Sequence, residues 1–169
     1  QSVILHIVKP RIWCLNNIQK NLLQEKFITK EYKNSIISVN KIKRSPDYIA
    51  YIGRADPEKG TGIFENLKIP EKRSLIFVGP NQSEIVKTKF IKNLIFTGWL
   101  NKQELNEIYT KIRLLIFPSV WLEVDPLTPM ELMSKGIPVL STKNNIFGQW
   151  MSGKMPELIY NDVEDLNEL

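Results

Sequence analysis

The amino-acid sequence predicts an α/β fold built on a doubly wound parallel sheet. Short runs of aliphatic and β-branched residues alternate with segments of helical periodicity, and these runs show little polar alternation. Strands without polar alternation are buried on both faces, which is typical of a parallel sheet covered by helices on both sides. The chain of 169 residues is long enough to form one such domain.

The predicted strands are bounded by glycine, proline and polar residues, which favour turns. They cover residues 35–39, 48–52, 74–78, 93–96, 113–117, 137–141 and 158–160. The clearest helix covers residues 101–111, where Asn101 suits the N-cap and Glu104 occupies the capping-box position. Its apolar stripe consists of Leu105, Ile108, Tyr109 and Ile112.

Two further helices are expected between the strands. One covers about residues 16–27, where leucines and isoleucine recur at helical spacing. The other covers about residues 126–135, with Asp125 as its N-cap, Pro126 at its first position and Gly136 beyond its end. A last helix is expected to start near Asp162, and the chain ends inside it.

The N-terminal part differs from the rest in composition and in pattern. Residues 40–46 are polar and basic and end in Pro46, as a linker does. One predicted helix and one predicted strand precede them, which is too little for a domain. We therefore expect residues 1–44 to be the remnant of an N-terminal domain with its linker. Residues 45–169 would form the main domain, truncated at its C-terminal end.

Composition excludes several classes of protein. The chain is 43% hydrophobic and 24% charged, and Cys14 is its single cysteine, so an intrachain disulfide is impossible. No apolar run reaches the roughly 18 residues of a membrane span, and no secretory signal is visible, so a cytoplasmic location is expected. The net charge of +5 is concentrated before residue 45. That charge suits a solvated surface or peripheral contact with the inner face of a membrane; without a recognised motif, nucleic acid is not expected.

The first candidate site follows the strand at residues 48–52. Gly53 and Gly60 flank a loop that carries Arg54 and Lys59. Ligands of doubly wound sheets bind beyond the carboxyl ends of the strands, and these two cations suit a diphosphate. The glycines allow close approach of the backbone. A solvated arginine and lysine in a surface turn is the alternative.

The second candidate site follows the strand at residues 113–117. The free amides of Leu127 and Thr128 at the start of the predicted helix attract an anion. Glu123 lies on the preceding loop and Glu131 later on the helix. Core packing does not account for two carboxylates around a helix N-terminus; a surface or capping role for Glu131 is the alternative.

A third candidate site combines two glycine turns at the same predicted edge of the sheet. Gly79 and Gly98 each end a strand, and Trp99 follows the second. Such turns can hold a flat base between backbone groups, with the indole beside it. The tryptophans Trp13, Trp121 and Trp150 are expected to be packing residues.

Taken in order, these motifs are similar to the C-terminal domain of group 1, or family-four, glycosyltransferases, which are retaining enzymes of the GT-B fold. The resemblance covers about residues 48–165. It rests on Gly-Arg-x4-Lys-Gly, Val-Gly-Pro, Thr-Gly-x-Leu, Phe-Pro-Ser-x-Trp-x-Glu-x7-Glu and Gly-Ile-Pro-Val-Leu-Ser, each of the first four after a predicted strand. The pair Glu123-x7-Glu131 is the most diagnostic of these features.

The resemblance implies a role for each of these residues. Arg54 and Lys59 would bind the diphosphate of the donor, and Glu131 the ribose hydroxyls. Glu123, the expected catalytic residue, would position the transferred sugar together with backbone amides of residues 124–128. The family uses UDP- or GDP-sugars, transfers them to glycan or lipid-linked acceptors in reactions such as polysaccharide biosynthesis, and needs no cofactor and no metal in this domain.

The sequence departs from the family pattern in four respects, one of which is that Met133 and Ser134 stand near where the family usually has alanines. Asp125 and Pro126 replace an aromatic-glycine pair, and Asn144 and Asn145 replace a glycine pair. Most of the acceptor-binding domain, with its glycine-rich loop and active-site histidine, is missing; His6 is too close to the predicted linker to be that histidine. A fragment without this partner domain is expected to have little activity of its own.

Two other functions remain open from the sequence. A non-catalytic nucleotide-binding or interaction module would keep the fold and transfer nothing, which the departures favour and the Arg54, Lys59, Glu123 and Glu131 set opposes. A metal-dependent transferase would use Glu123-Val124-Asp125 as an acid-x-acid motif, although two cations already stand at the diphosphate loop.

Overall fold

A six-stranded parallel sheet forms the centre of the computed structural model, which describes residues 11–14, 28–31, 47–85, 87–122 and 126–168. Its order is β5-β4-β3-β6-β7-β8, and every neighbouring pair is parallel. The first of these strands along the chain therefore lies in the middle, which confirms the doubly wound, Rossmann-like fold. The strands are β3 (Tyr48–Ile52), β4 (Ser74–Val78), β5 (Leu94–Gly98), β6 (Ile112–Phe117), β7 (Val139–Thr142) and β8 (Ile159–Tyr160).

Helices connect most of these strands. The α-helices are α3 (Lys102–Lys111), α4 (Leu127–Ser134), α5 (Ile146–Ser152) and α6 (Val163–Glu168). Short 3-10 helices are η1 (Pro57–Lys59), η2 (Thr61–Glu65), η3 (Gln82–Glu84) and η4 (Pro156–Leu158). Within the described ranges, none of the helices combines the length and the apolar character that a bilayer span requires.

The capping box predicted for α3 is present. The side-chain oxygen of Asn101 accepts hydrogen bonds from the backbone of Gln103 and Glu104 at 2.9 and 3.1 Å. The Glu104 carboxylate in turn accepts the backbone N–H of Asn101 at 2.7 Å. These bonds satisfy three backbone N–H groups at the helix start that would otherwise be unpaired. The same residues made this boundary predictable from the sequence.

Several predicted boundaries are shifted. Strand β5 ends two residues later than expected, at Gly98, and β7 begins two residues later, at Val139. Leu158, predicted as the start of the last strand, belongs to η4, because Pro156 favours the first position of a helical turn. Pro126 is the N-cap of α4 rather than its first helical residue.

Before residue 47 the structure describes one small sheet. Strands β1 (Arg11–Cys14) and β2 (Ile28–Glu31) pair in parallel, and neither was predicted. Each is only four residues long, and Ile-Thr-Lys-Glu has no recognisable strand pattern. The helix predicted at residues 16–27, the strand predicted at 35–39 and His6 lie outside the described residues. The division at residues 44 and 45 stays a prediction.

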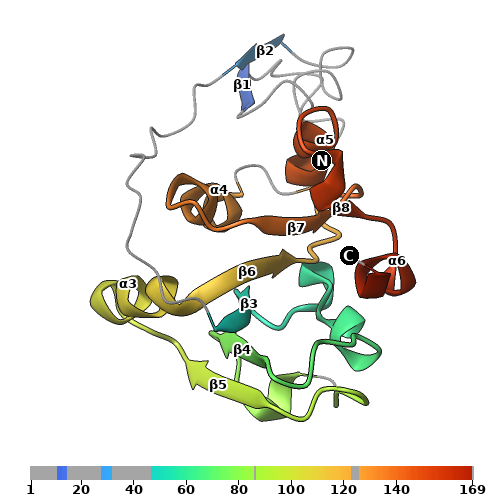
Figure 1. Cartoon of the computed structure of the whole chain (residues 1–169). Coiled ribbons are helices and arrows are strands. Elements are labelled where there is room, and N and C mark those ends of the chain that lie inside the picture. The colour runs from blue at the N-terminus through green and yellow to red at the C-terminus, as the bar shows by residue number, and fades with distance from the viewer. Residues whose placement is uncertain (1–10, 15–27, 32–46, 86, 123–125, 169) are drawn as a thin grey trace.

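The core has two halves, one on each face of the sheet. Along β3, Ile49 and Tyr51 join one half while Ala50 joins the other, because successive strand residues point to opposite faces. Helices α3, α4 and α5 contribute Tyr109, Leu132, Phe147 and Met151 to the half around Ala50. Helices η2 and α6 cover the other half with residues that include Phe64 and Leu166. Figure 1 shows α3 and α4 on one side of the sheet and α6 on the other.

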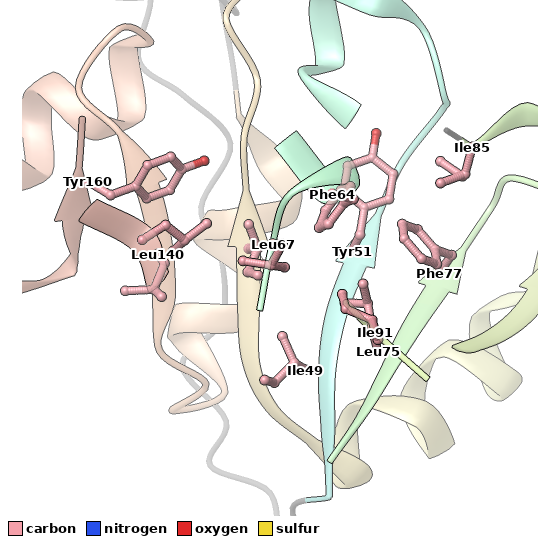
Figure 2. Packing of buried hydrophobic residues seen from close by; sticks show 12 residues of the cluster. Ile49, Tyr51, Phe64, Leu67, Leu75, Phe77, Ile85, Ile91, Leu140 and Tyr160 are labelled. Atoms are coloured by element: carbon pink, nitrogen blue, oxygen red, sulfur yellow. The ribbon is translucent and has the colours of Figure 1, made fainter. Parts of the chain in front are cut away.

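Aromatic rings dominate the half of the core beneath η2 (Figure 2). The ring of Phe64 packs edge-on against Phe77 and Tyr51, with centroids 5.0 and 5.4 Å apart. Phe77 also stacks on Phe96 at 4.9 Å. Such aromatic pairs contribute about 0.5–1.5 kcal/mol beyond their burial. They bind η2, and with it the end of the Gly53–Gly60 loop, to strands β3, β4 and β5.

Tyr160 places a hydroxyl group in the same half of the core. Its side chain is 2% exposed and lies beside Leu140 (Figure 2). Among the described residues its hydroxyl has no hydrogen-bond partner, and burial raises the pKa of this phenol above its usual value. A buried, unpaired hydroxyl group destabilises a fold, because it has lost its hydrogen bonds to water.

We predict that Tyr160→Phe raises the free energy of unfolding by about 1 kcal/mol, because it removes an unpaired polar group and leaves the ring in place. Urea denaturation monitored by circular dichroism measures the change. Tyr109→Phe is the matched control, because the Tyr109 hydroxyl donates to Glu131 at 3.4 Å and this variant loses a bond. A less stable Tyr160→Phe would show that the hydroxyl has a partner in solution.

Candidate functional site

The order of the strands places a ligand crevice between β3 and β6. The chain leaves β3 toward β4 and leaves β6 toward β7, so the connections diverge at this pair of neighbours. Doubly wound sheets bind their ligands at this switch point. A cavity of about 70 Å³ opens beyond the carboxyl ends of both strands. It is lined by Tyr51, Ile52, Gly53, Lys59, Phe117, Pro118, Ser119 and Thr128.

Three of the predicted donor-binding residues meet in this cavity. Gly53 and Lys59 come from the loop after β3, and Thr128 comes from the first turn of α4. The first two predicted sites are therefore parts of one site. An ammonium group and a helix N-terminus on the same cavity make it suitable for an anion.

Two loops that are far apart in the sequence are joined at this cavity. The Glu58 carbonyl oxygen accepts hydrogen bonds from the backbone N–H groups of Val120 and Trp121, at 3.0 and 3.3 Å. It also accepts the Ser119 hydroxyl at 3.3 Å. Because Glu58 precedes Lys59, these bonds fix the backbone that carries the lysine against the loop after β6. The sequence did not single out Glu58, since its backbone rather than its side chain makes the contacts.

The contact between these two loops also requires a glycine at position 60. Its φ of +69° lies in the left-handed region, which glycine adopts readily. A Cβ atom at this position would lie 2.0 Å from the Pro118 carbonyl oxygen. The two loops therefore touch through bare backbone, and a side chain here would push them apart.

Arg54 lies on the same loop but does not line the cavity. Its guanidinium pairs with the Asp56 carboxylate at 2.7 Å, and 60% of its side chain is exposed. Its carbonyl oxygen accepts the Tyr51 hydroxyl, which holds the backbone at the mouth of the loop. An exposed pair of this kind contributes about 0–1 kcal/mol, so a diphosphate can recruit the guanidinium at little cost. The sequence showed both charges, but we did not predict their pairing.

The glycine turns that end β3, β4 and β5 lie side by side. The N–H of Gly53 donates to the Val78 carbonyl at 3.0 Å, and that of Gly79 donates to the Gly98 carbonyl at 2.8 Å. A Cβ atom on Gly79 would lie 2.4 Å from the Gly53 carbonyl oxygen and 3.5 Å from the Trp99 ring. Trp99 itself is 72% exposed. The turns thus form a strip of backbone that is partly exposed at Gly53 and Gly98 and buried at Gly79, with an indole beside it. Base binding by these turns stays a prediction.

The N-terminus of α4 presents two backbone donors. Pro129 has no N–H, and the N–H of Met130 already bonds to the Pro126 carbonyl at 3.3 Å. Leu127 and Thr128 are therefore the residues whose amides have no partner within the helix. Asp125, the predicted N-cap, lies outside the described residues, as do Glu123 and Val124. The catalytic role of Glu123 stays a prediction.

Glu131 lies one turn after Thr128 on the same side of α4. Its carboxylate accepts the Tyr109 hydroxyl at 3.4 Å and lies 3.8 Å from the ammonium of Lys135. Burial, and then the Glu131 charge, raise the pKa of Tyr109 above its usual value. Both contacts are long, and 44% of the Glu131 side chain is exposed. The carboxylate therefore has lone pairs left for a ligand hydroxyl.

Of the tryptophans that the sequence predicted to be packing residues, Trp121 is largely exposed and Trp150 packs in part. Trp121 is 60% exposed and Trp150 is 50% exposed. The ring of Trp150 still contacts Phe147, one helical turn earlier, and the Lys154 ammonium, with distances of 6.1 Å between ring centroids and 3.8 Å from ammonium to ring. The prediction is wrong for Trp121, which lies in a loop and follows no strand or helix pattern. In the part of the chain that the structure describes, no group of three or more His, Cys, Asp or Glu residues could hold a metal ion.

We predict that Gly60→Ala lowers the free energy of unfolding by about 1–3 kcal/mol, through backbone strain and the clash with Pro118. Gly62→Ala is the matched control, because a Cβ atom there meets nothing within 4 Å. Chemical denaturation of both variants measures the difference. Equal stability of the two variants would contradict the described contact between the loops.

The comparisons with known proteins agree with this architecture. A family model described as glycosyl transferases group 1 matches residues 33–151. Two solved structures share the fold over 99% of this chain. Anabaena Alr3699/HepE in complex with UDP and glucose is 14% identical with a TM-score of 0.73, and sucrose-phosphate synthase from Thermosynechococcus elongatus is 15% identical with a TM-score of 0.66. This chain covers 56% and 49% of those chains.

Two curated proteins are related in sequence. An uncharacterized 41.2 kDa protein in the cps region of Klebsiella pneumoniae is 23% identical over 133 residues, and the sulfoquinovosyl transferase SQD2 of Arabidopsis thaliana is 29% identical over 119 residues. The alignments cover 77% and 69% of this chain, but only 37% and 22% of those proteins. Since the family model matches well over half of the chain, this chain belongs to the group 1 glycosyl transferases.

Proposed function

We propose that this chain is the donor-binding half of a retaining glycosyltransferase and binds a UDP- or GDP-sugar for transfer to a glycan or lipid-linked acceptor. The observation that carries the proposal is the cavity at the switch point, where Gly53, Lys59 and Thr128 meet. A glycosyltransferase of this family needs an anion site at this edge of the sheet, because its leaving group is a nucleoside diphosphate.

The chemistry of the site suits that leaving group. When the bond between the sugar and the diphosphate breaks, negative charge develops on the phosphate oxygens. The ammonium of Lys59 and the amides of Leu127 and Thr128 are fixed donors that stabilise this charge. Arg54 adds a second cation once the diphosphate draws it from Asp56. Glu123 would position the transferred sugar, and Glu131 the ribose.

The base would lie along the strip of glycine turns. Gly53 and Gly98 are partly exposed and Gly79 is buried, and the exposed indole of Trp99 borders these turns. An aromatic surface beside accessible backbone supports stacking and hydrogen bonding at the same time. Uracil and guanine both have a ring face that can stack on an indole, so the first binding experiment includes UDP and GDP.

A non-catalytic nucleotide-binding module is the second candidate function. The Arg54–Asp56 pair favours it, since a carboxylate next to the diphosphate loop opposes the developing negative charge. Both functions require nucleotide binding, and sugar transfer separates them. A thermal-shift panel of UDP, GDP, ADP and their sugars, with and without metal, tests the shared part. A ligand at one hundred times its Kd adds about 2.7 kcal/mol of stability.

We predict that this chain alone binds a nucleoside diphosphate but transfers little or no sugar. Transfer requires donor and acceptor to be held in contact, and the chain covers only about half of the solved structures that share its fold. Isothermal calorimetry and a radiolabelled transfer assay measure the two properties. Efficient transfer by the monomer would contradict the prediction.

We also predict that Arg54→Ala and Glu131→Ala weaken binding in different ways. Arg54→Ala weakens UDP by about tenfold and leaves uridine unchanged, because a charged hydrogen bond to phosphate contributes about 1.5–3 kcal/mol. Glu131→Ala weakens uridine and UDP by a similar factor, and has a smaller effect on a 2′-deoxy analogue. Calorimetry of both variants with the three ligands measures this.

Lys102→Ala is the control for both variants, because Lys102 begins α3 and is exposed. A loss of UDP affinity in Arg54→Ala that Lys102→Ala matches and that disappears at high salt would indicate general attraction between phosphate and a basic protein.

A further inference from the structure

Asn145 forms hydrogen bonds in two directions from the N-cap of α5. Its side chain is buried, with 1% of its surface exposed. The carbonyl oxygen of the side chain accepts the Gly148 backbone N–H at 2.7 Å, which is the usual role of an N-cap. The amide nitrogen donates to the Ser119 backbone carbonyl at 2.8 Å and to the Ser141 hydroxyl at 3.1 Å. One side chain thus joins α5 and β7 to the loop after β6.

The start of α5 is held in place by backbone packing and by the core. A Cβ atom on Gly148 would lie 1.9 Å from the Thr142 carbonyl oxygen, so the first turn of α5 packs directly on the backbone that follows β7. Phe147 and Met151 anchor the helix in the core at 2% and 1% exposure. Asn145 therefore extends its amide toward Ser119 from a position that cannot easily move.

From Ser119 the connection continues to the loop after β3. Ser119 is 1% exposed, and its hydroxyl donates to the Glu58 carbonyl at 3.3 Å. Glu58 is followed by Lys59, which lines the cavity together with Ser119. A continuous set of hydrogen bonds therefore leads from the N-cap of α5 to the backbone that carries the cation.

We propose that Asn145 is a positioning residue for the nucleotide site. Its amide nitrogen fixes the loop after β6 and, through Ser119 and Glu58, the position of Lys59 across the cavity. Capping alone does not require an amide, because an aspartate or serine oxygen caps a helix as well. The amide nitrogen is the part of the side chain that serves the loop. This inference rests on the proposed function and identifies what holds its site in shape.

Asn145→Asp and Asn145→Ser separate the two roles. Both variants keep an oxygen for the cap, and both lose the amide nitrogen that donates to the Ser119 carbonyl. We expect UDP affinity to fall by about tenfold or more in each, with α5 still formed. The serine variant is neutral, so the result does not depend on whether the protein tolerates a buried carboxylate.

Two control variants isolate the effect. Asn101→Asp alters the N-cap of α3 in the same way, and the Asn101 side chain bonds to Gln103 and Glu104 of its own helix. Leu166→Ala loosens α6 from the other half of the core and leaves α5 and the amide in place. We expect both to bind UDP within about twofold of the parent protein at a temperature where every variant is folded. Equal weakening by Leu166→Ala would overturn the proposal, because it would show that any loss of core packing weakens binding.

Hydrogen exchange without nucleotide tests the geometry independently of the proposed function. The N–H groups of Val120 and Trp121, which donate to Glu58, should exchange about tenfold faster in both Asn145 variants than in Asn101→Asp. Unchanged exchange at these two amides would overturn the positioning role. A parent protein that binds neither UDP nor GDP, with exchange accelerated as expected, would contradict the proposed function and leave the positioning role supported.

Discussion

The backbone carbonyl of Glu58 is the contact on which the geometry of the site depends. It accepts hydrogen bonds from three groups of the loop after β6, which lies on the other side of the switch point. Parallel strands align the two loops at one edge of the sheet, but alignment alone leaves their separation free. The Glu58 bonds and the contact of Gly60 with Pro118 set that separation. A ligand therefore meets a cavity that is already formed, and ordering the loops costs it less free energy.

The hydrophobic core also stabilises this contact between the loops after β3 and β6. Phe64 of η2 packs against Tyr51 and Phe77, so the segment that follows Gly60 is held by aromatic contacts within the core. The backbone of the Lys59 loop is therefore restrained at both ends, by the Tyr51 hydroxyl at Arg54 and by the packing of η2. The candidate binding residues lie on short loops, and the rigid sheet determines the position of those loops.

Most of the fold could be predicted from the sequence, because buried strands and capped helices leave local patterns. β3 and β4 were predicted at their observed bounds, and the capping box of α3 was predicted residue by residue. β1 and β2 were missed, since four-residue strands with charged side chains show no recognisable alternation of polar and apolar residues.

At the site, glycines and cations were visible in the sequence, whereas the pairing of Arg54 with Asp56 and the role of the Glu58 carbonyl were not. Both depend on contacts that residue types do not encode. Asn145 was noted only as a departure from a glycine pair, and its bonds to Ser119 and Gly148 give that departure a physical reason.

The central position of β3 also has a consequence for how the domain folds. β3 pairs with β6 from Tyr48 and Ile112 onward, so two strands, their connections and α3 intervene before the middle of the sheet can close. Closing so long a loop has an entropic cost that local contacts do not offset, and folding slows as contacting residues lie farther apart in sequence. During synthesis, β3, β4 and β5 leave the ribosome before β6 and expose one apolar edge and two apolar faces until it arrives. The candidate site therefore cannot form before β6 is made, because it exists only once β3 and β6 have paired.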